Sequence, residues 1–218
     1  YLDILEKIKN INAKTKEKGF KPSQYWAEEL ENFDYLFEAT PLIVNKLRHH
    51  SYHITGLKVY DYRTNKNKHL AQVKSKLGAL KKLDQGKYRV TESPALGGFG
   101  HDIDGDLYNI DTLKFYEVLI GMERSGLLEN LFKIPEKRNL ILEIGSGWGG
   151  FPYQFKSNYP NTTYVILDFP ELFIFSYVYL ATVFPEAKVK IYGDMADDEL
   201  FSNWEEYDFI FIPHTFIN

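Results

Sequence analysis

The chain has 218 residues, 44% hydrophobic and 26% charged, with a formal net charge of −4. This composition suits a folded protein with a substantial core, and it offers no basic footprint for nucleic acid or an anionic membrane. The absence of cysteine excludes a disulfide framework, a thiolate zinc site and a cysteine nucleophile. No secretory signal pattern occurs, and no apolar run reaches the ~18–20 residues of a membrane span. We therefore expect a cytoplasmic protein with no membrane span.

Residues 1–135 are predicted to form a mainly helical N-terminal region. Apolar residues recur there at helical spacing in three places: at the N-terminus, after Ser23 as a predicted N-cap, and in the lysine-rich stretch 66–83. The apolar positions are Ile4, Leu5, Ile8 and Ile11, then Trp26, Leu30, Phe33, Leu36 and Phe37, and then Leu70, Val73, Leu77 and Leu80. We expect a further helix from Asp111, as its cap, to about residue 130.

The segment 92–106 is rich in Gly, Asp and Pro and is predicted to be a loop, either over an active site or on the plain surface. Asp102, Asp104 and Asp106 have the spacing of a calcium loop. However, Leu107 and Leu113 stand where that loop needs Gly and a bidentate Glu. His49 and His53 have the i, i+4 spacing of a zinc pair, but no third ligand is evident. We predict no metal site.

Residues 136–218 alternate between strand and helix patterns, which predicts an α/β fold with a parallel sheet. The predicted strands are 139–144, 162–168, 187–193 and 207–213, and the predicted helices are 149–159, 170–184 and 198–204. The sequence ends just after the fourth strand, where a doubly wound sheet would leave a hydrophobic strand with little cover. We therefore expect a fragment of a longer protein, truncated after the fourth strand.

The segment 140–150, LILEIGSGWGG, reads as an apolar strand, a glycine-rich turn and the start of a helix. Gly145 permits a sharp turn, and Gly147 permits close approach of the backbone to a ligand. Gly150, or Gly149, permits close packing of the helix, whose N-terminus offers unpaired N–H groups. The same spacing also satisfies the dinucleotide fingerprint G-x-G-x-x-G, so NAD remains an alternative ligand.

Three acids mark the ends of successive strands: Glu143, Asp168 and Asp194. The carboxyl ends of strands are where open α/β sheets bind ligands. Glu143 favours a ligand with a cationic amine and sulfonium and would repel a pyrophosphate. Asp168 suits ribose hydroxyls, and Asp194 with Met195 suits an adenine ring.

These motifs, E-x-G-x-G-x-G, then D-F-P-E, then G-D-M, resemble the class I S-adenosylmethionine-dependent methyltransferases, and most nearly the bacterial putative sugar O-methyltransferases. LYNIDTLKFYE at 107–117 and HTF at 214–216 add to that resemblance. It implies a Rossmann-like methyltransferase fold with a seven-stranded sheet, and it implies a base at His214. The implied cofactor contacts are Glu143, Gly145, Ser146, Gly147, Asp168, Phe169, Asp194 and Met195.

The resulting hypothesis is an S-adenosylmethionine-dependent O-methyltransferase that acts on a hydroxyl of a sugar or glycan precursor. The N-terminal helices would shape the acceptor pocket or a homodimer contact, and no nucleic-acid partner is expected. Two alternatives use the same glycine-rich turn. One is a nicotinamide-dependent dehydrogenase, and the other is a non-catalytic Rossmann-like binding module.

Overall fold

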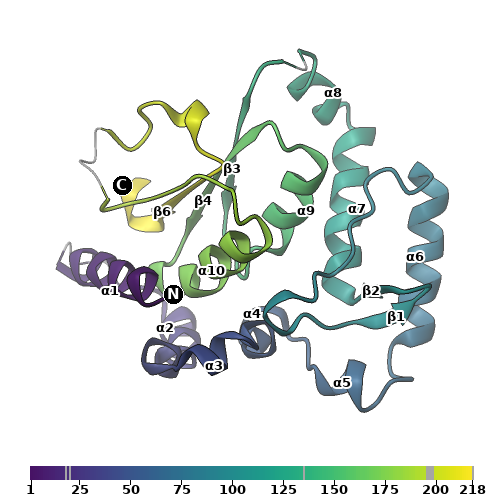
Figure 1. Cartoon of the computed structure of the whole chain (residues 1–218), viewed down its shortest axis with the longest axis horizontal. Helices are drawn as coiled ribbons and strands as arrows, with labels where there is room; N and C mark the ends of the chain where they lie inside the picture. The colour runs from purple at the N-terminus through teal and green to yellow at the C-terminus, as the bar shows by residue number, and fades with distance from the viewer. Residues whose placement is uncertain (18, 20, 135, 195–198, 218) are drawn as a thin grey trace.

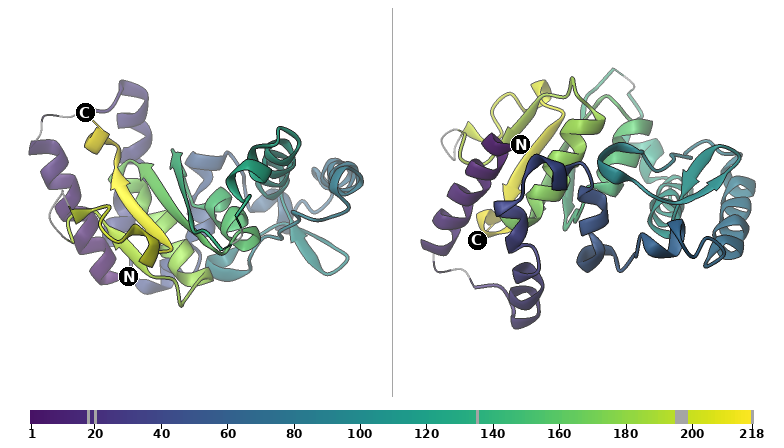
Figure 2. Two further views of the ribbon diagram at one scale, coloured as in Figure 1. Left: turned by 90° about the horizontal axis from the view of Figure 1, so that it is seen from above. Right: turned by 60° about the horizontal axis from the view of Figure 1, so that its bottom comes forward.

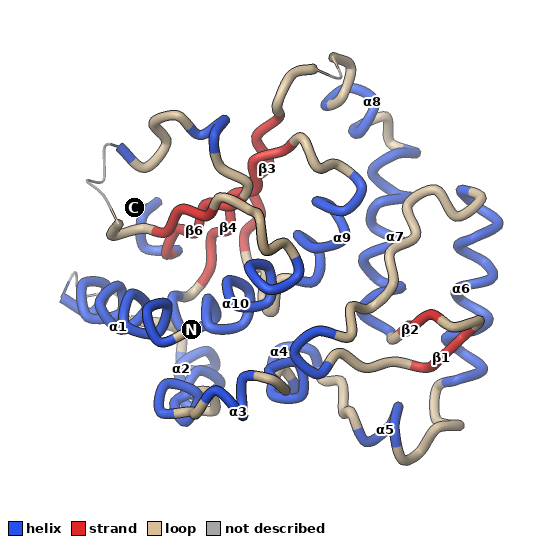
Figure 3. Tube along the Cα trace, in the orientation of Figure 1, coloured by secondary structure: helices blue, strands red, loops and turns tan. Residues whose placement is uncertain are grey.

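The computed structural model (Figure 1, Figure 3) describes residues 1–17, 19, 21–134, 136–194 and 199–217. Its α-helices are α1 (Leu2–Glu17), α2 (Gln24–Glu31), α3 (Pro41–Val44), α4 (Tyr52–Thr55), α5 (Tyr60–Arg63), α6 (Leu70–Asp84), α7 (Ile110–Arg124), α8 (Leu127–Leu131), α9 (Gly150–Asn158) and α10 (Phe173–Val183). Its 3₁₀ helices are η1 (Asp34–Glu38), η2 (Leu47–His50), η3 (Ala95–Gly97), η4 (Pro170–Leu172), η6 (Trp204–Glu206) and η7 (His214–Ile217). Its strands are β1 (His101–Ile103), β2 (Asp106–Tyr108), β3 (Asn139–Ile144), β4 (Thr162–Asp168), β5 (Val189–Ile191) and β6 (Phe209–Pro213).

The chain is an α/β protein with a four-stranded parallel sheet in the order β3-β4-β6-β5. The four strands predicted in residues 136–218 are all present, and β3 and β4 have the predicted bounds. Every residue of β4 and β6 is buried, as expected for strands covered on both faces. The predicted α/β class with a parallel sheet is therefore confirmed.

The strand order differs from the standard doubly wound arrangement, in which the first strand lies between the second and the fourth. Here the second strand, β4, lies between the first, β3, and the fourth, β6. As a result β3 is an edge strand, and its Leu140, Leu142 and Ile144 side chains are exposed. The strand that lacks cover is thus β3, whereas β6, the last strand in the sequence, is buried.

The N-terminal helices pack onto the sheet region. Helix α1 contacts α10 and η4, and both views of Figure 2 place it next to the C-terminal strand β6. Helix α7 contacts both α6 and α9. The Thr163 hydroxyl of β4 lies 2.9 Å from the Trp204 carbonyl and 2.7 Å from the Tyr207 carbonyl, which share its one proton, so the connection from β5 to β6 lies against β4. The buried apolar residues of the N-terminal and sheet regions form one continuous cluster.

Several predicted helix bounds are wrong for local reasons. The helix after Ser23 ends at Glu31 and is followed by η1, and α6 starts only at Leu70, because His69 adopts a left-handed conformation. Asn109, not Asp111, caps α7, because Asn109 and Thr112 form a reciprocal capping box. That helix ends at Arg124, before Gly126 in the left-handed region.

The C-terminal helix prediction for 198–204 is also wrong over its described part. Residues 200–203 form turns, and η6 covers Trp204–Glu206 instead. Lys190 on β5 donates to the backbone carbonyls of Glu199 and Ser202, which holds these turns against the sheet. The boundary residue Pro135 and the acid Asp198 lie outside the described residues.

The loop prediction for 92–106 misses a β-hairpin. Strands β1 and β2 pair antiparallel around Asp104 and Gly105, which both have positive φ, at 58° and 87°. Positive φ at both central residues is the signature of a type I′ turn, for which Asp-Gly is a favoured dipeptide. The Asp102 carboxylate accepts a hydrogen bond from the Gly105 amide and closes the turn.

A buried ion pair joins the N-terminal region to the glycine-rich turn. The Arg48 and Glu92 side chains are at most 2% exposed, and Arg48 Nε donates to Glu92 Oε1 at 2.8 Å. Glu92 also accepts from the Asn109 side-chain amide, so the pair is tied to the cap of α7. The Arg48 guanidinium lies 3.4 Å from the centroid of Trp148, within the turn. Within the described ranges, no helix is long and apolar enough to span a membrane.

We expect Arg48→Ala to lower the free energy of unfolding by about 3–5 kcal/mol, because it leaves the Glu92 carboxylate buried without its cation. Urea denaturation at neutral pH measures this change. The control is Lys76→Ala, which breaks an exposed ion pair with Glu117 and is expected to cost less than about 1 kcal/mol. Equal losses in the two variants would contradict a structural role for the buried pair.

Candidate functional site

The turn after β3 is built from glycines in the left-handed region. Gly145, Gly147 and Gly149 have φ of 79°, 56° and 88°. The Gly145 amide donates to the Leu167 carbonyl at 2.8 Å, which anchors the turn on β4. A Cβ on Gly149 would lie 3.1 Å from Ser176 Cα, so this glycine lets the start of α9 approach α10 closely. The predicted sharp turn is therefore present between β3 and α9.

Asp168, at the end of β4, connects the glycine-rich turn to His214. Its carboxylate accepts from the amides of Gly147 at 2.9 Å and of Phe169 at 2.8 Å. Its backbone carbonyl lies 3.3 Å from His214 Nδ1. Burial raises the pKa of Asp168 to about 6, although hydrogen bonds from Gly147, Phe169 and Ser146 lower it. The side chain is thus a desolvated acid held in place by backbone amides.

Glu143, on β3, is the second acid of the site and is half-buried. Its Oε2 accepts a hydrogen bond from the Tyr164 hydroxyl of β4 at 3.0 Å. Burial raises the pKa of Glu143 to about 7; the Tyr164 hydrogen bond opposes this rise, and the charge of Asp168 adds to it. Among the described residues, neither Glu143 nor Asp168 forms an ion pair. The two coupled acids therefore favour a cation.

His214 follows β6 directly and packs against Phe169, with ring centroids 4.3 Å apart. Because the Asp168 carbonyl can only accept, the hydrogen bond to it places the imidazole proton on Nδ1 and the basic lone pair on Nε2. Burial lowers the pKa of His214. The imidazole is accordingly neutral at pH 7 and able to take up a proton.

A cavity of about 320 Å³ lies beside His214 and Phe169. Its other walls come from α1, α2, η1 and η4, so the N-terminal helices and the carboxyl edge of the sheet enclose it together. Polar side chains from both parts line it: Asn12, Thr15, Lys16, Glu31, Asp34 and Glu171. Trp26 on α2 lies close by, with its ring centroid 5.3 Å from that of Phe169.

The structure brings together seven of the predicted cofactor and catalytic residues and sets Asp194 apart from them. Asp194 follows β5, which β6 separates from β4, and its carboxylate pairs with Lys7 of α1 at 3.0 Å. It lines a different cavity, of about 360 Å³, with Lys7 and Tyr192. Met195 lies outside the described residues. The seven residues that lie together are Glu143, Gly145, Ser146, Gly147, Asp168, Phe169 and His214.

Two neighbours of the site do not follow from the sequence motifs. A Cβ on Gly147 would lie 2.8 Å from Ile54 Cγ2, so Ile54 of α4 makes the close approach that this glycine permits. Tyr164 places its hydroxyl on Glu143 from within a fully buried strand. The signal in the sequence is a tyrosine within a strand predicted to be buried, because a buried hydroxyl needs a hydrogen-bond partner.

The histidine and aspartate patterns in the N-terminal region do not form a metal site. His49 lies in η2 and His53 in α4, where His53 Nδ1 is 3.3 Å from Glu29 Oε2. Asp106 pairs with Arg89 at 3.3 Å. In the part of the chain that the structure describes, no group of three or more His, Asp or Glu side chains is arranged to hold a metal ion.

Comparison of the chain with protein families, curated proteins and solved structures finds no match.

The raised pKa of Glu143 makes its contribution to stability depend on pH. The folded-state pKa of about 7 lies above the ordinary 4.5, so between these values the folded state binds more protons than the unfolded state. The contribution of this residue to the free energy of unfolding therefore falls as pH rises through that range. We expect Glu143→Gln to be stabilising by about 2–3 kcal/mol at about pH 8 and nearly neutral at about pH 4.

Urea denaturation of the variant and the wild type across this pH range measures the difference. Taking the difference removes the contributions of the histidines, whose lowered pKa values act in the opposite direction. Glu186→Gln, in an exposed residue after α10, is the control and should show no trend. A pH-independent difference for Glu143→Gln would show that this carboxyl group is not desolvated.

Proposed function

We propose that this chain binds S-adenosylmethionine and transfers its methyl group to a hydroxyl of a sugar or glycan precursor. The observation that carries the proposal is a pair of neighbouring acids with raised pKa, the half-buried Glu143 and the buried Asp168, beside a glycine-rich turn. No cation from the described residues pairs with either acid. A ligand that carries an ammonium and a sulfonium group would offset their desolvation, whereas the pyrophosphate of a dinucleotide would be repelled.

The Rossmann-like methyltransferase fold is part of the same proposal. It draws support from the unit β3–turn–α9–β4, in which parallel neighbouring strands place both acids at one edge of the sheet. The strand order and the position of Asp194 lend no support, because β6 stands between β4 and β5. The proposed cofactor site therefore consists of the glycine-rich turn with Glu143 and Asp168, and it does not include Asp194.

The acceptor assignment draws on the cavity beside His214. Aromatic faces such as Phe169, together with carboxylate and amide side chains, suit the apolar faces and hydroxyls of a sugar ring. Bound S-adenosylmethionine would supply an electrophilic methyl group. His214 Nε2 would take the proton of the acceptor hydroxyl as the new C–O bond forms and the C–S bond breaks. Positioning by the cavity walls would supply much of the rate.

The first test is ligand identity by calorimetric titration of the whole chain. We expect S-adenosylmethionine and S-adenosylhomocysteine to bind saturably and NAD not to bind up to about 1 mM. Glu143→Gln is expected to weaken S-adenosylmethionine binding about 10-fold or more, because it removes a carboxylate that favours the cation, while Glu186→Gln stays within about twofold. Saturable NAD binding that Asp168→Ala abolishes would instead indicate a dehydrogenase.

The second test addresses the base. Methyl transfer from radiolabelled S-adenosylmethionine to glucose, rhamnose and their methyl glycosides is expected to fall about 100-fold or more in His214→Ala. The affinity for S-adenosylhomocysteine should stay within about threefold, since the base acts on the acceptor. Unchanged turnover would place the base elsewhere, and a collapse of cofactor affinity would make His214 a structural residue.

A further inference from the structure

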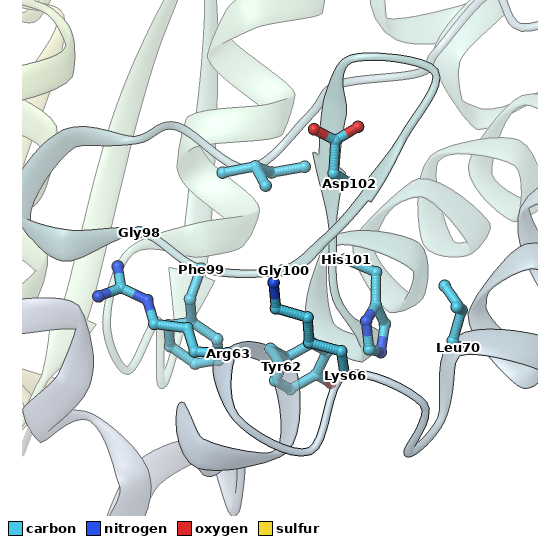
Figure 4. A pocket seen from close by; sticks show the side chains of 10 residues that line it. Tyr62, Arg63, Lys66, Leu70, Gly98, Phe99, Gly100, His101 and Asp102 are labelled. Carbon is cyan, nitrogen blue, oxygen red and sulfur yellow. The ribbon is translucent and has the colours of Figure 1, made fainter.

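A second cavity, of about 490 Å³, lies between the end of α5 and the β1–β2 hairpin. It is separate from the carboxyl edge of the parallel sheet, and Figure 1 shows α5 and the hairpin at the opposite end of the molecule from α1. Figure 4 shows Arg63 and Lys66 extending from the end of α5 toward the ribbon that carries Gly98, Phe99 and Gly100.

The cavity carries positive charge that the protein itself does not neutralise. Arg63 and Lys66 are exposed, and neither side chain forms a hydrogen bond or an ion pair within the described part of the chain. Asp102 is the one acid on the lining, and its carboxylate is engaged by the Gly105 amide at 3.0 Å. In Figure 4 that carboxylate points away from Arg63 and Lys66. In a chain of net charge −4, this local excess of cations favours an anion.

A buried histidine on the same wall supplies an independent observation. His101 is 3% exposed, and its Nε2 has no hydrogen-bond partner among the described residues. Its ring forms a hydrogen bond with the backbone of Lys68. The nearby positive charges of His69 and Lys74 disfavour a positive charge on the His101 imidazole. Buried polar atoms are ordinarily satisfied, so this nitrogen is a vacant position for a ligand oxygen.

The remaining wall of the cavity is apolar. It consists of Tyr62 and Phe99, whose ring centroids lie 5.3 Å apart, and of the half-buried Leu70 and Leu107. A bare inorganic anion would contact the cations and leave this surface unused. An anion attached to a ring or another apolar group would cover it, which is favourable in proportion to the area buried.

We propose that this cavity binds a phosphate ester. Its phosphate group lies between Arg63, Lys66 and His101, and its organic group lies against Tyr62, Phe99, Leu70 and Leu107. Arg63 and Lys66 supply charge-assisted hydrogen bonds, and His101, protonated in the complex, donates from Nε2 to a phosphate oxygen. This cavity is separate from the cofactor site, because the residues that line it do not include Glu143, Asp168 or His214.

Calorimetric titration with uridine diphosphate, glucose 1-phosphate and pyrophosphate tests the proposal. We expect at least one of the two organic phosphates to bind saturably and more tightly than pyrophosphate. The double variant Arg63→Gln/Lys66→Gln should weaken that binding about 10-fold or more, while Lys82→Gln, an exposed lysine on α6, should leave it within about twofold. Which organic phosphate binds tighter distinguishes a nucleoside from a sugar as the attached group.

The titration of His101, followed by NMR, gives a second readout. Burial and the charges of His69 and Lys74 lower the pKa of His101, and a bound phosphate should raise it. The rise should disappear in Arg63→Gln/Lys66→Gln. The proposal is overturned if neither organic phosphate binds up to about 10 mM, if pyrophosphate binds as tightly as both, or if Lys82→Gln weakens binding equally. An unchanged His101 titration with ligand bound would also overturn it.

Discussion

The Arg48 guanidinium, stacked on Trp148 and paired with Glu92, is the interaction on which the arrangement of this molecule depends. The arginine comes from η2, and its two partners come from the segment after α6 and from the glycine-rich turn. Through Glu92 the pair also reaches Asn109, whose capping box starts α7. A buried pair contributes little net stability compared with apolar residues of the same shape, but it permits few alternative geometries. Its role here is therefore to fix how the helical region meets the sheet.

The contacts of Arg48 with Trp148 and Glu92 also position the candidate site. Trp148 belongs to the same turn as Gly145 and Gly147. Arg48 also donates a hydrogen bond to the Ser51 hydroxyl. Three residues after Ser51, Ile54 lies against Gly147. Asp168 then fixes the other side of the turn. The site is thus held from the helical region on one side and from β4 on the other.

The sequence predicts the local elements of the sheet region well, because strong apolar runs and a glycine-rich turn bound them. Strands β3 and β4 match residue for residue. The order of the strands depends on pairing across the whole chain, and periodicity carries no information about it. For that reason Asp194, grouped with Glu143 and Asp168 by position in the sequence, lies beyond β6 and pairs with Lys7.

In the N-terminal region the wrong predictions concern segments whose sequence is compatible with two local structures. Asn109 and Asp111 can each cap a helix, and the reciprocal bond from Thr112 decides for Asn109. The composition of 92–106 indicates a loop, whereas the dipeptide Asp104-Gly105 within it indicates a hairpin turn, and the pairing of β1 with β2 decides for the hairpin. In each case a specific hydrogen bond outweighs average residue preference.

Because β3 is an edge strand, pairing of another strand with it would affect ligand binding at Glu143. Among the residues that the structure describes, the strand that carries Glu143 pairs with a neighbour on one side only, and its Leu140, Leu142 and Ile144 side chains are exposed. A strand added at this edge, from this chain or another, would pair with the backbone of β3 and cover that apolar stripe. It would also stiffen the backbone from which the Glu143 carboxylate projects. Ligand affinity at the acid pair would then vary with protein concentration.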